Sequence, residues 1–376
     1  MPVENISTLA KDAFGDPSVI PLWLGEGDLP TPKLASDAVA AALAAGHVFY
    51  TYQQGIPELR NTLAEYLTDL HGSAVAADRI TVTAGGMGAI TLAVTMLVEP
   101  GDNVLVIEPV WPNIGGAVRV AGGIPRPVAM DYSKDGWQLD VAKLESYCDH
   151  RTKAVFFASP GNPTGAMIPL ETQRALLEVC RRRGIWIVAD EVYNRMVFGR
   201  RSAPSIAQIA HPDDRVLIIN SFSKSWAMTG WRLGWLVHPA PLGALLANLT
   251  QYSNSGLPTF LQHAAITVVR DGEPFVERVN RYSAHGMQLV CDALDQMPHV
   301  RVGARPSAGM YVFFQVDGMD DSRAAARAIL AQTRIGLAPG AFFGQGSQRF
   351  LRLCCCRSPD QLATALARLR VFFDTP

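Results

Sequence analysis

The stretch INSFSKSWAMTGWRLGW, residues 219–235, places Lys224 between two serines directly after an apolar run. That run, RVLIIN at 215–220, is typical of a buried strand, and the segment after the lysine contains three Trp and two Gly. Lysine normally lies on a solvated surface. A lysine in these surroundings, with Arg232 eight residues later, therefore indicates a functional use for both cations.

Short apolar runs alternate with longer amphipathic stretches on both sides of this segment. Largely apolar strand patterns lie at 103–109, 153–160 and 184–193, and residues 170–184 have the pattern of a helix. Residues 79–97 read as a strand, a Gly-rich turn and a helix. This alternation predicts an α/β fold with a mainly parallel central sheet covered by helices on both faces.

The C-terminal third of the chain has a different pattern, which predicts a smaller α+β domain. Its expected elements are a long helical stretch at 258–297, a strand at 309–316, a helix at 322–333, a strand at 349–356 and a closing helix at 358–374. We expect a large domain at 49–275 and a small domain formed by both chain ends, 1–48 and 276–376. The N-terminal segment, including a helix at 32–46, is expected to pack on the C-terminal part.

The composition of the 376-residue chain argues against several classes of protein. The net charge of −1 gives no electrostatic basis for binding nucleic acid or an anionic membrane. No apolar run is long enough to span a membrane, and residues 1–16 lack the apolar core of a secretory signal. The six cysteines form no CxxC pair and the eight histidines no HxxxH pair. We therefore expect a cytoplasmic protein with reduced thiols, no disulfide framework and no metal.

Polar groups follow the predicted strands, at the edge of a parallel sheet where ligands collect. Residues 84–88, AGGMG, form a turn whose backbone N–H groups suit an anion, although such turns also occur for purely structural reasons. Asn162 lies in the loop PGNPTG after one strand, and Asp190 ends another, followed by Tyr193. Asp190 on its own would also fit a helix cap.

Together these groups meet the requirements of pyridoxal phosphate. An apolar setting lowers the pKa of a lysine and makes its amine a usable nucleophile toward an aldehyde. A carboxylate such as Asp190 keeps the ring nitrogen protonated, which lets the ring act as an electron sink. Serine hydroxyls, the Arg232 fork and a helix N-terminus suit a phosphate. This use explains why Lys224 and Arg232 stand where they do.

The chain resembles the fold type I pyridoxal-phosphate enzymes, specifically the class I and II aminotransferases, nearly from end to end. The segments SFSKSWAMTGWRLGW and ASPGNPTG carry the resemblance most specifically. It implies that Lys224 forms the Schiff base and moves the proton and that Asp190 pairs with the ring nitrogen. It further implies that Asn162 and Tyr193 bind the ring hydroxyl, Trp111 and Val192 cover the ring faces, and Ser221, Arg232, Gly86 and Met87 bind the phosphate.

The resemblance also implies residues outside the sheet edge. In FYTYQQGIPELR, residues 49–60, the tyrosine five residues before the glycine is Tyr50, which would reach the phosphate of a neighbouring subunit in a homodimer with shared active sites. An aromatic flank of a helix would look the same. In RFLRLCCC, Arg352 rather than Arg349 has the apolar neighbours of the arginine that binds the substrate α-carboxylate. Gly25, in LWLGEGD, resembles the residue whose backbone assists it.

Two details depart from the family pattern: Cys354 stands where Ser or Asn is common, and GEGD replaces GEPD. The three cysteines at 354–356 fit either packed strand residues or an oxidation-sensitive spot. Some aspartate-preferring relatives carry a lysine in the phosphate loop, where this chain has Met87, and Trp23 and Trp226 are expected near the site. This favours an apolar or broad range of amino donors.

The implied reaction moves an amino group from an L-amino acid to a 2-oxo acid with ping-pong kinetics, and Lys224 is the general base. The same residues also suit a carbon–sulfur β-lyase or a related lyase or synthase on this scaffold. A pyridoxal-phosphate-binding regulator would need a fused DNA-binding module, for which no residues are left. A nucleotide-binding protein that uses the turn at 85–88 would explain neither Lys224 nor Asp190.

Overall fold

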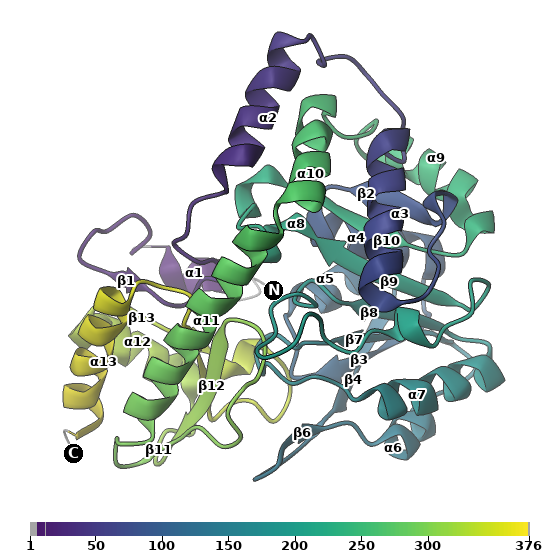
Figure 1. Ribbon diagram of the computed structural model, residues 1–376. Coiled ribbons are helices and arrows are strands. Elements are labelled where there is room, and N and C mark those ends of the chain that lie inside the picture. Colours follow the sequence, from purple (N-terminus) through teal and green to yellow (C-terminus); the bar gives the residue numbers. More distant parts are fainter. Residues whose placement is uncertain (1–5, 12, 375–376) are drawn as a thin grey trace.

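The central sheet has seven strands in the order β2-β10-β9-β8-β7-β3-β4. In this computed structural model, which describes residues 6–11 and 13–374, β10 is antiparallel to both neighbours and all other adjacent pairs are parallel. The predicted α/β fold with a mainly parallel sheet is thereby confirmed (Figure 1). The strands are β2 Ile80–Thr83, β3 Asn103–Glu108, β4 Ile124–Ala129, β7 Thr152–Ala158, β8 Trp186–Asp190, β9 Val216–Ser221 and β10 Gly234–Val237.

Apolar side chains on both faces of each central strand explain why the sheet is buried between helix layers. In β3, Val104 and Val106 pack into one cluster with α4, α5 and α9, whereas Leu105 and Ile107 pack into another with α3, α7 and α10. Alternate residues of a strand point to opposite faces, so a continuous apolar run buries both. The α-helices of this part are α3 Pro57–His71, α4 Gly85–Leu97, α5 Asn113–Val120, α6 Val141–Ser146, α7 Leu170–Arg183, α8 Phe222–Ser225, α9 Gly243–Ser253 and α10 Thr259–Asp271.

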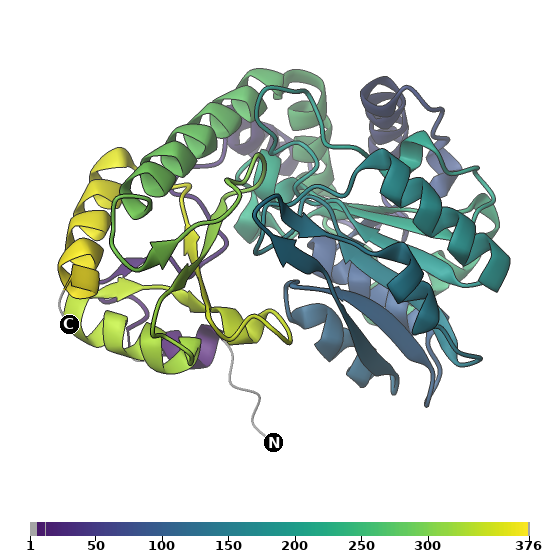
Figure 2. The ribbon, with the colours of Figure 1, turned by 90° about the horizontal axis from the view of Figure 1, so that it is seen from below.

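The C-terminal elements build a second, smaller part of the molecule beside the first (Figure 2). Its antiparallel sheet has the order β11-β12-β15-β14. Residues Val312, Phe314, Leu351 and Leu353 face the helices, and this alternation turns Arg352 to the opposite face. The elements are α11 Glu273–Leu294, β11 Val300–Arg301, β12 Tyr311–Val316, α12 Ser322–Thr333, β13 Ile335–Gly336, β14 Ala338–Pro339, β15 Phe350–Cys354 and α13 Pro359–Asp374.

The N-terminal segment is divided between the central sheet with its helices (the central part) and the C-terminal sheet with its helices (the C-terminal part). Strand β1, Ile20–Pro21, pairs with β13, whereas α2, Lys33–Ala44, lies along α10 (Figure 1). The expectation that this whole segment packs on the C-terminal part is wrong for α2, because Ala35 and its apolar neighbours join the core cluster of the central part. The remaining elements are α1 Ile6–Ala10, the hairpin β5 Asp131–Ser133 and β6 Gly136–Gln138, and the 3₁₀ helices η1 Ala77–Arg79, η2 Ile206–Gln208, η3 Thr229–Trp231, η4 Ala240–Leu242 and η5 Gly340–Phe342.

The long helical stretch predicted at 258–297 is two helices, α10 and α11, separated at Gly272. Pro274, near the start of α11, has no N–H with which to continue an α-helical ladder. A Cβ at Gly272 would also collide with the carbonyl oxygen of Val268. The chain therefore changes direction where α11 leaves the central part.

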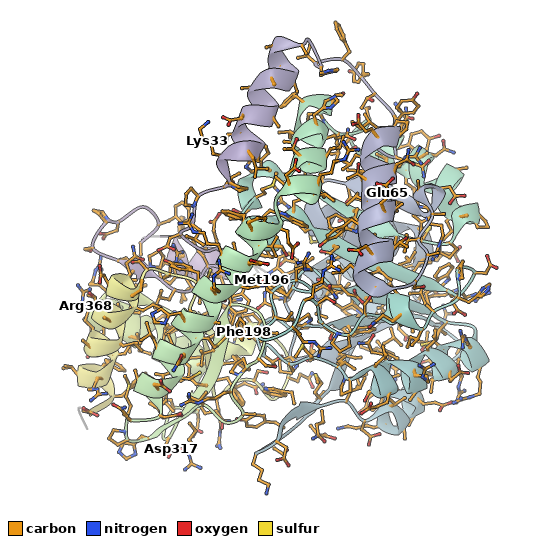
Figure 3. The ribbon with its side chains drawn as sticks, viewed as in Figure 1. Lys33, Glu65, Met196, Phe198, Asp317 and Arg368 are labelled. Atoms are coloured by element: carbon orange, nitrogen blue, oxygen red, sulfur yellow. The ribbon has the colours of Figure 1, made fainter. Side chains whose placement is uncertain are left out.

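The two parts meet along the loop that follows β8. Met196 and Phe198 lie between them (Figure 3), and Met196 packs in a buried cluster with Tyr193 and Tyr311. The proposed boundaries, 49–275 for the large domain and 1–48 with 276–376 for the small one, remain predictions.

Candidate active site

A cavity of about 490 Å³ opens where the carboxyl ends of the central strands meet the C-terminal sheet. Both parts of the molecule line it, so its shape depends on how they pack. The structure brings the following predicted site residues to its wall: Gly25, Gly86, Met87, Trp111, Asn162, Asp190, Val192, Tyr193, Ser221, Lys224, Arg232 and Arg352.

One end of the cavity is lined by a helix start, serine hydroxyls and the Arg232 guanidinium, a combination suited to an anion. Helix α4 begins at Gly85, whose φ of +72° glycine adopts without strain, and a Cβ there would lie 2.5 Å from Arg232 Nη2. The Ser221 hydroxyl hydrogen-bonds that of Ser223 at 2.8 Å. Unpaired N–H groups at a helix start, hydroxyls and a guanidinium are suitable ligands for a phosphate.

Lys224 lies in the short helix α8 directly after β9, and its Nζ donates a hydrogen bond to the carbonyl oxygen of Gly25. Burial lowers the pKa of this amine to about 8. Roughly a tenth of the amine is therefore uncharged at pH 7, far more than for an ordinary lysine, and the uncharged form is the one that acts as a nucleophile or general base.

Asp190 ends β8 as a buried carboxylate. Its Oδ1 accepts from the backbone N–H of Val192 at 3.2 Å, and burial raises its pKa to about 6. A buried carboxylate is costly without a cation or further donors. A protonated ring nitrogen in the cavity would supply such a partner.

Arg352 reaches the cavity from β15. Its Nη1 donates to Asn162 Oδ1 at 2.9 Å and its Nη2 to the Trp23 carbonyl oxygen, while the buried Nε has no hydrogen-bond partner among the described residues. The guanidinium carbon lies 4.3 Å from the ring centroid of Tyr311 and 4.8 Å from that of Phe343. Arg349, by contrast, is on the surface and pairs with Asp320 at 2.8 Å.

Tyr50 lies outside this cavity and is 94% exposed, in the segment between α2 and α3. Trp226, expected near the site together with Trp23, does not line the cavity; it packs against Phe222 and Trp235 in the core. The three cysteines at 354–356 are buried and burial raises the pKa of each thiol, which favours the interpretation as packed strand residues.

Among the cavity residues that were not identified from the sequence are Glu26, Thr229 and Tyr311. The Thr229 hydroxyl donates to the Glu26 carboxylate, and the Tyr311 hydroxyl shares a 2.6 Å hydrogen bond with that of Tyr193. Glu26 stands next to Gly25 in the sequence, which was a signal for its position. Tyr311 follows Gly309 and Met310 in an apolar strand and gave no such signal.

A basic amine of lowered pKa, a buried carboxylate with no ion pair among the described residues, and a set of groups suited to an anion lie around one cavity. They fit pyridoxal phosphate, whose aldehyde, ring nitrogen and phosphate need these three partners. The fold and the site together define a pyridoxal-phosphate-dependent enzyme of fold type I.

Comparisons with known proteins identify the family. The model of the family "Aminotransferase class I and II" matches residues 19–369. The arginine–pyruvate transaminase AruH of Pseudomonas aeruginosa is 33% identical over 96% of this chain and 91% of its own length. The aspartate aminotransferase of Thermotoga maritima is 31% identical over 95% of this chain and 92% of its own.

Solved structures agree with the sequence relatives. A mutant of the Thermus thermophilus aspartate aminotransferase has a TM-score of 0.92 at 28% identity, covering 99% of this chain and 97% of that one. An aromatic aminotransferase from Pyrococcus horikoshii has a TM-score of 0.89 at 26% identity, covering 97% and 98%. The chain belongs to the class I and II aminotransferases, and the predicted activity and cofactor are thereby confirmed.

Proposed function

We propose that this aminotransferase takes amino donors with apolar or aromatic side chains, and that Lys224, Asp190 and Arg352 perform the roles that the resemblance implies. The observation that carries the proposal is the charge of the cavity wall. Among its described residues the basic side chains are Lys224, Arg232 and Arg352, which the amine, phosphate and α-carboxylate roles occupy. No further cation of this chain's described wall is left for a second carboxylate.

The rest of the cavity wall supports the same donor class. Apolar residues line it as well: Trp23, Leu24, Met87, Ile90 and Trp111. The Glu26 carboxylate, also on the wall, would repel a donor that carries a second carboxylate. An apolar donor side chain gains free energy when it leaves water for this surface.

The position of a side chain supports each proposed role. Arg352 grips the α-carboxylate with its fork, assisted by Asn162, and so fixes the direction of the Cα–H bond. The uncharged Lys224 amine takes the Cα proton and later returns it. Asp190 holds a proton on the ring nitrogen. Pyridoxal phosphate supplies an aldehyde that binds amines covalently and a ring that withdraws electrons from the α-carbon.

We also propose a homodimer in which the partner's copy of Tyr50 completes the phosphate site. Phe49 is 81% exposed, and Tyr50, Tyr52 and Tyr252 are exposed beside it. The hydrogen bonds from Thr259 to the Phe49 carbonyl oxygen and from Gln53 to Gln251 bring these segments together. Exposed aromatic side chains that gather in this way are typical of interaction surfaces, which supports a subunit interface here.

Borohydride reduction of the holoenzyme followed by peptide mapping tests the cofactor link. We expect the label on Lys224; a label on another residue would refute the assignment. A panel of L-amino acids with pyruvate or 2-oxoglutarate then tests the donor class. We expect leucine, methionine or phenylalanine to have the highest kcat/KM, and a clear preference for aspartate would overturn this part of the proposal.

The same assays separate transamination from the lyase alternative. A β-lyase would release ammonia and pyruvate from cystathionine without an oxo-acid acceptor, whereas we expect amino-group transfer that depends on the acceptor.

Among the described residues all six cysteines are free thiols, which supports a cytoplasmic location as part of the proposal. Among those residues, no helix is both long and apolar enough to cross a membrane, and no cluster of side chains could hold a metal ion.

A further inference from the structure

Tyr311 lies where the proton-transfer side of the cavity meets the carboxylate-binding side. It is fully buried at the start of β12, and its hydroxyl is 2.6 Å from that of Tyr193. The hydroxyl also lies against Gly25, where an added Cβ would collide with it and would lie 3.6 Å from Lys224 Nζ. Its ring, in turn, lies 4.3 Å from the Arg352 guanidinium carbon. One side chain thus contacts Tyr193, Gly25 and Arg352.

The number of hydrogens in the tyrosine pair determines the direction of its hydrogen bond. Burial raises the pKa of Tyr193 well above its ordinary value and that of Tyr311 to about 12, so both phenols are protonated at neutral pH. Each phenol then has one hydrogen to donate. If Tyr193 donates its hydrogen to the ring oxygen of the cofactor, only Tyr311 can supply the hydrogen between the two tyrosines.

We propose that Tyr311 is a positioning residue of the aminotransferase site, which donates to the Tyr193 hydroxyl and so strengthens the hydrogen bond that Tyr193 gives to the ring oxygen of the cofactor. This inference rests on the proposed function and on the role that the resemblance implies for Tyr193, a hydrogen bond to the ring hydroxyl of the cofactor. A hydroxyl that accepts a hydrogen bond becomes a better donor, because hydrogen bonds in a chain polarise one another. Tyr311 thus acts on the cofactor through Tyr193, while its ring lies under the Arg352 guanidinium.

The visible absorption band of the holoenzyme reports this effect. A stronger donor at the ring oxygen withdraws negative charge from it. Less negative charge near the cofactor-bound Lys224 nitrogen lowers the pH at which that nitrogen loses its proton. Tyr311→Phe removes the hydroxyl and keeps the ring. We expect it to raise the pH midpoint of the band by roughly 0.2 to 0.7 pH units, the size expected when one hydrogen bond no longer polarises the next.

A double-mutant cycle separates this inference from the proposed function. Tyr193→Phe should raise the midpoint further than Tyr311→Phe does, and the double variant should match Tyr193→Phe. If Tyr193→Phe moves the midpoint but Tyr311→Phe does not, the role of Tyr311 is disproved while that of Tyr193 stands. If Tyr193→Phe leaves the midpoint unchanged, the proposed role of Tyr193 fails, and the inference fails with it.

Two further variants guard against a merely structural effect. 3-Fluorotyrosine at position 311 has nearly the shape of tyrosine but is a more acidic and stronger donor, so it should lower the midpoint. A rise, or no change, would contradict the proposal even if Tyr311→Phe folds poorly. Phe343→Leu removes the other ring beside Arg352 and serves as the control: it should weaken binding of a substrate carboxylate without moving the midpoint.

Discussion

At the scale of single residues, burial gives this site its chemistry. The Lys224 amine has a lowered pKa and the Asp190 carboxyl a raised one, both chiefly because burial disfavours the charged form. Neither group has an oppositely charged side chain bonded to it in the described chain, so each is left available to a ligand. Perturbed groups around a shared cavity are typical of catalysis.

The sequence predicts that Lys224, Asp190 and Asn162 lie at one edge of the sheet, because each stands at or shortly after the end of an apolar strand, where ligands of parallel sheets bind. The structure brings all three to the cavity wall. Arg352 is recognisable for a similar reason: apolar neighbours in a period of two place it on the face opposite Leu351 and Leu353. Tyr311 is not predictable in this way. Its contact with Tyr193 joins residues 118 positions apart and exists only once the two parts have packed.

Arg352→Lys tests the carboxylate-binding role. Lysine keeps the positive charge but loses the planar fork, so we expect kcat/KM for the amino donor to fall roughly 10- to 100-fold, mainly through KM. Arg349→Lys is the matched control, since Arg349 pairs with Asp320 on the surface, and it should stay within about twofold of wild type. Equal losses in the two variants would contradict the assignment.

Asp190→Asn tests whether this carboxylate is kept for function at a cost in stability. Its folded pKa is raised from 3.8 to about 6, so the folded apoprotein binds more protons than the unfolded chain between these values. The contribution of Asp190 to the free energy of unfolding therefore falls as the pH rises from about 4 to about 6, by at most roughly 3 kcal/mol in total. Apo Asp190→Asn should be more stable than wild type at pH 7.5, and the difference should vanish near pH 4.

Denaturant unfolding of both apoproteins across this pH range measures the difference. Glu65→Gln, an exposed carboxyl on α3, controls for the change in net charge and should show no such dependence. The same Asp190→Asn variant should bind pyridoxal phosphate more weakly, because it no longer stabilises a protonated ring nitrogen. If it gains no stability at pH 7.5, or binds the cofactor as tightly as wild type, this account of Asp190 is wrong.

At the scale of elements, close approach between backbone segments explains an element that the sequence patterns did not predict. Strand β10 was not predicted, because three apolar residues after a Gly are too short a pattern to reveal a strand or its direction. Gly234, its first residue, packs so tightly that a Cβ would lie 2.6 Å from the Asn220 carbonyl oxygen and 2.8 Å from the carbonyl carbon of Gly85. Strand β10 thus places Gly234, two residues after Arg232, against the start of α4.

Gly85→Ala tests this junction. Alanine at a φ of +72° is strained by about 1–2 kcal/mol, and its Cβ would displace the Arg232 guanidinium from the helix start. We expect the dissociation constant for pyridoxal phosphate to rise about tenfold or more, with a smaller loss of affinity for pyridoxal, which lacks the phosphate. Gly116→Ala, in α5 with open space around it, is the control and should leave cofactor binding unchanged. Equal effects on both ligands would show that the junction does not act through the phosphate.

At the scale of the whole molecule, the site is a product of assembly. Lys224 and Asp190 come from the central part, and Arg352 and Tyr311 from the C-terminal sheet. Tyr50 is too exposed to serve the cavity of its own chain, and its surroundings are aromatic. A second copy would bury this surface and bring its own Tyr50 to the first copy's phosphate site, which is the arrangement we propose.

Subunit mixing tests this arrangement directly. Lys224→Ala and Tyr50→Ala homodimers should each be strongly impaired, the first more than the second. In a hybrid dimer, the site with intact Lys224 receives an intact Tyr50 from its partner, while the other site carries both defects. With random pairing, half of the dimers are hybrids, and one of the two sites in each hybrid is intact. The activity of the mixture should therefore recover to about a quarter of the wild-type activity. Tyr52→Ala is the control for the choice of tyrosine and should not show the impairment of Tyr50→Ala. If the mixture gives only the average of its parents despite proven subunit exchange, Tyr50 does not act across the interface.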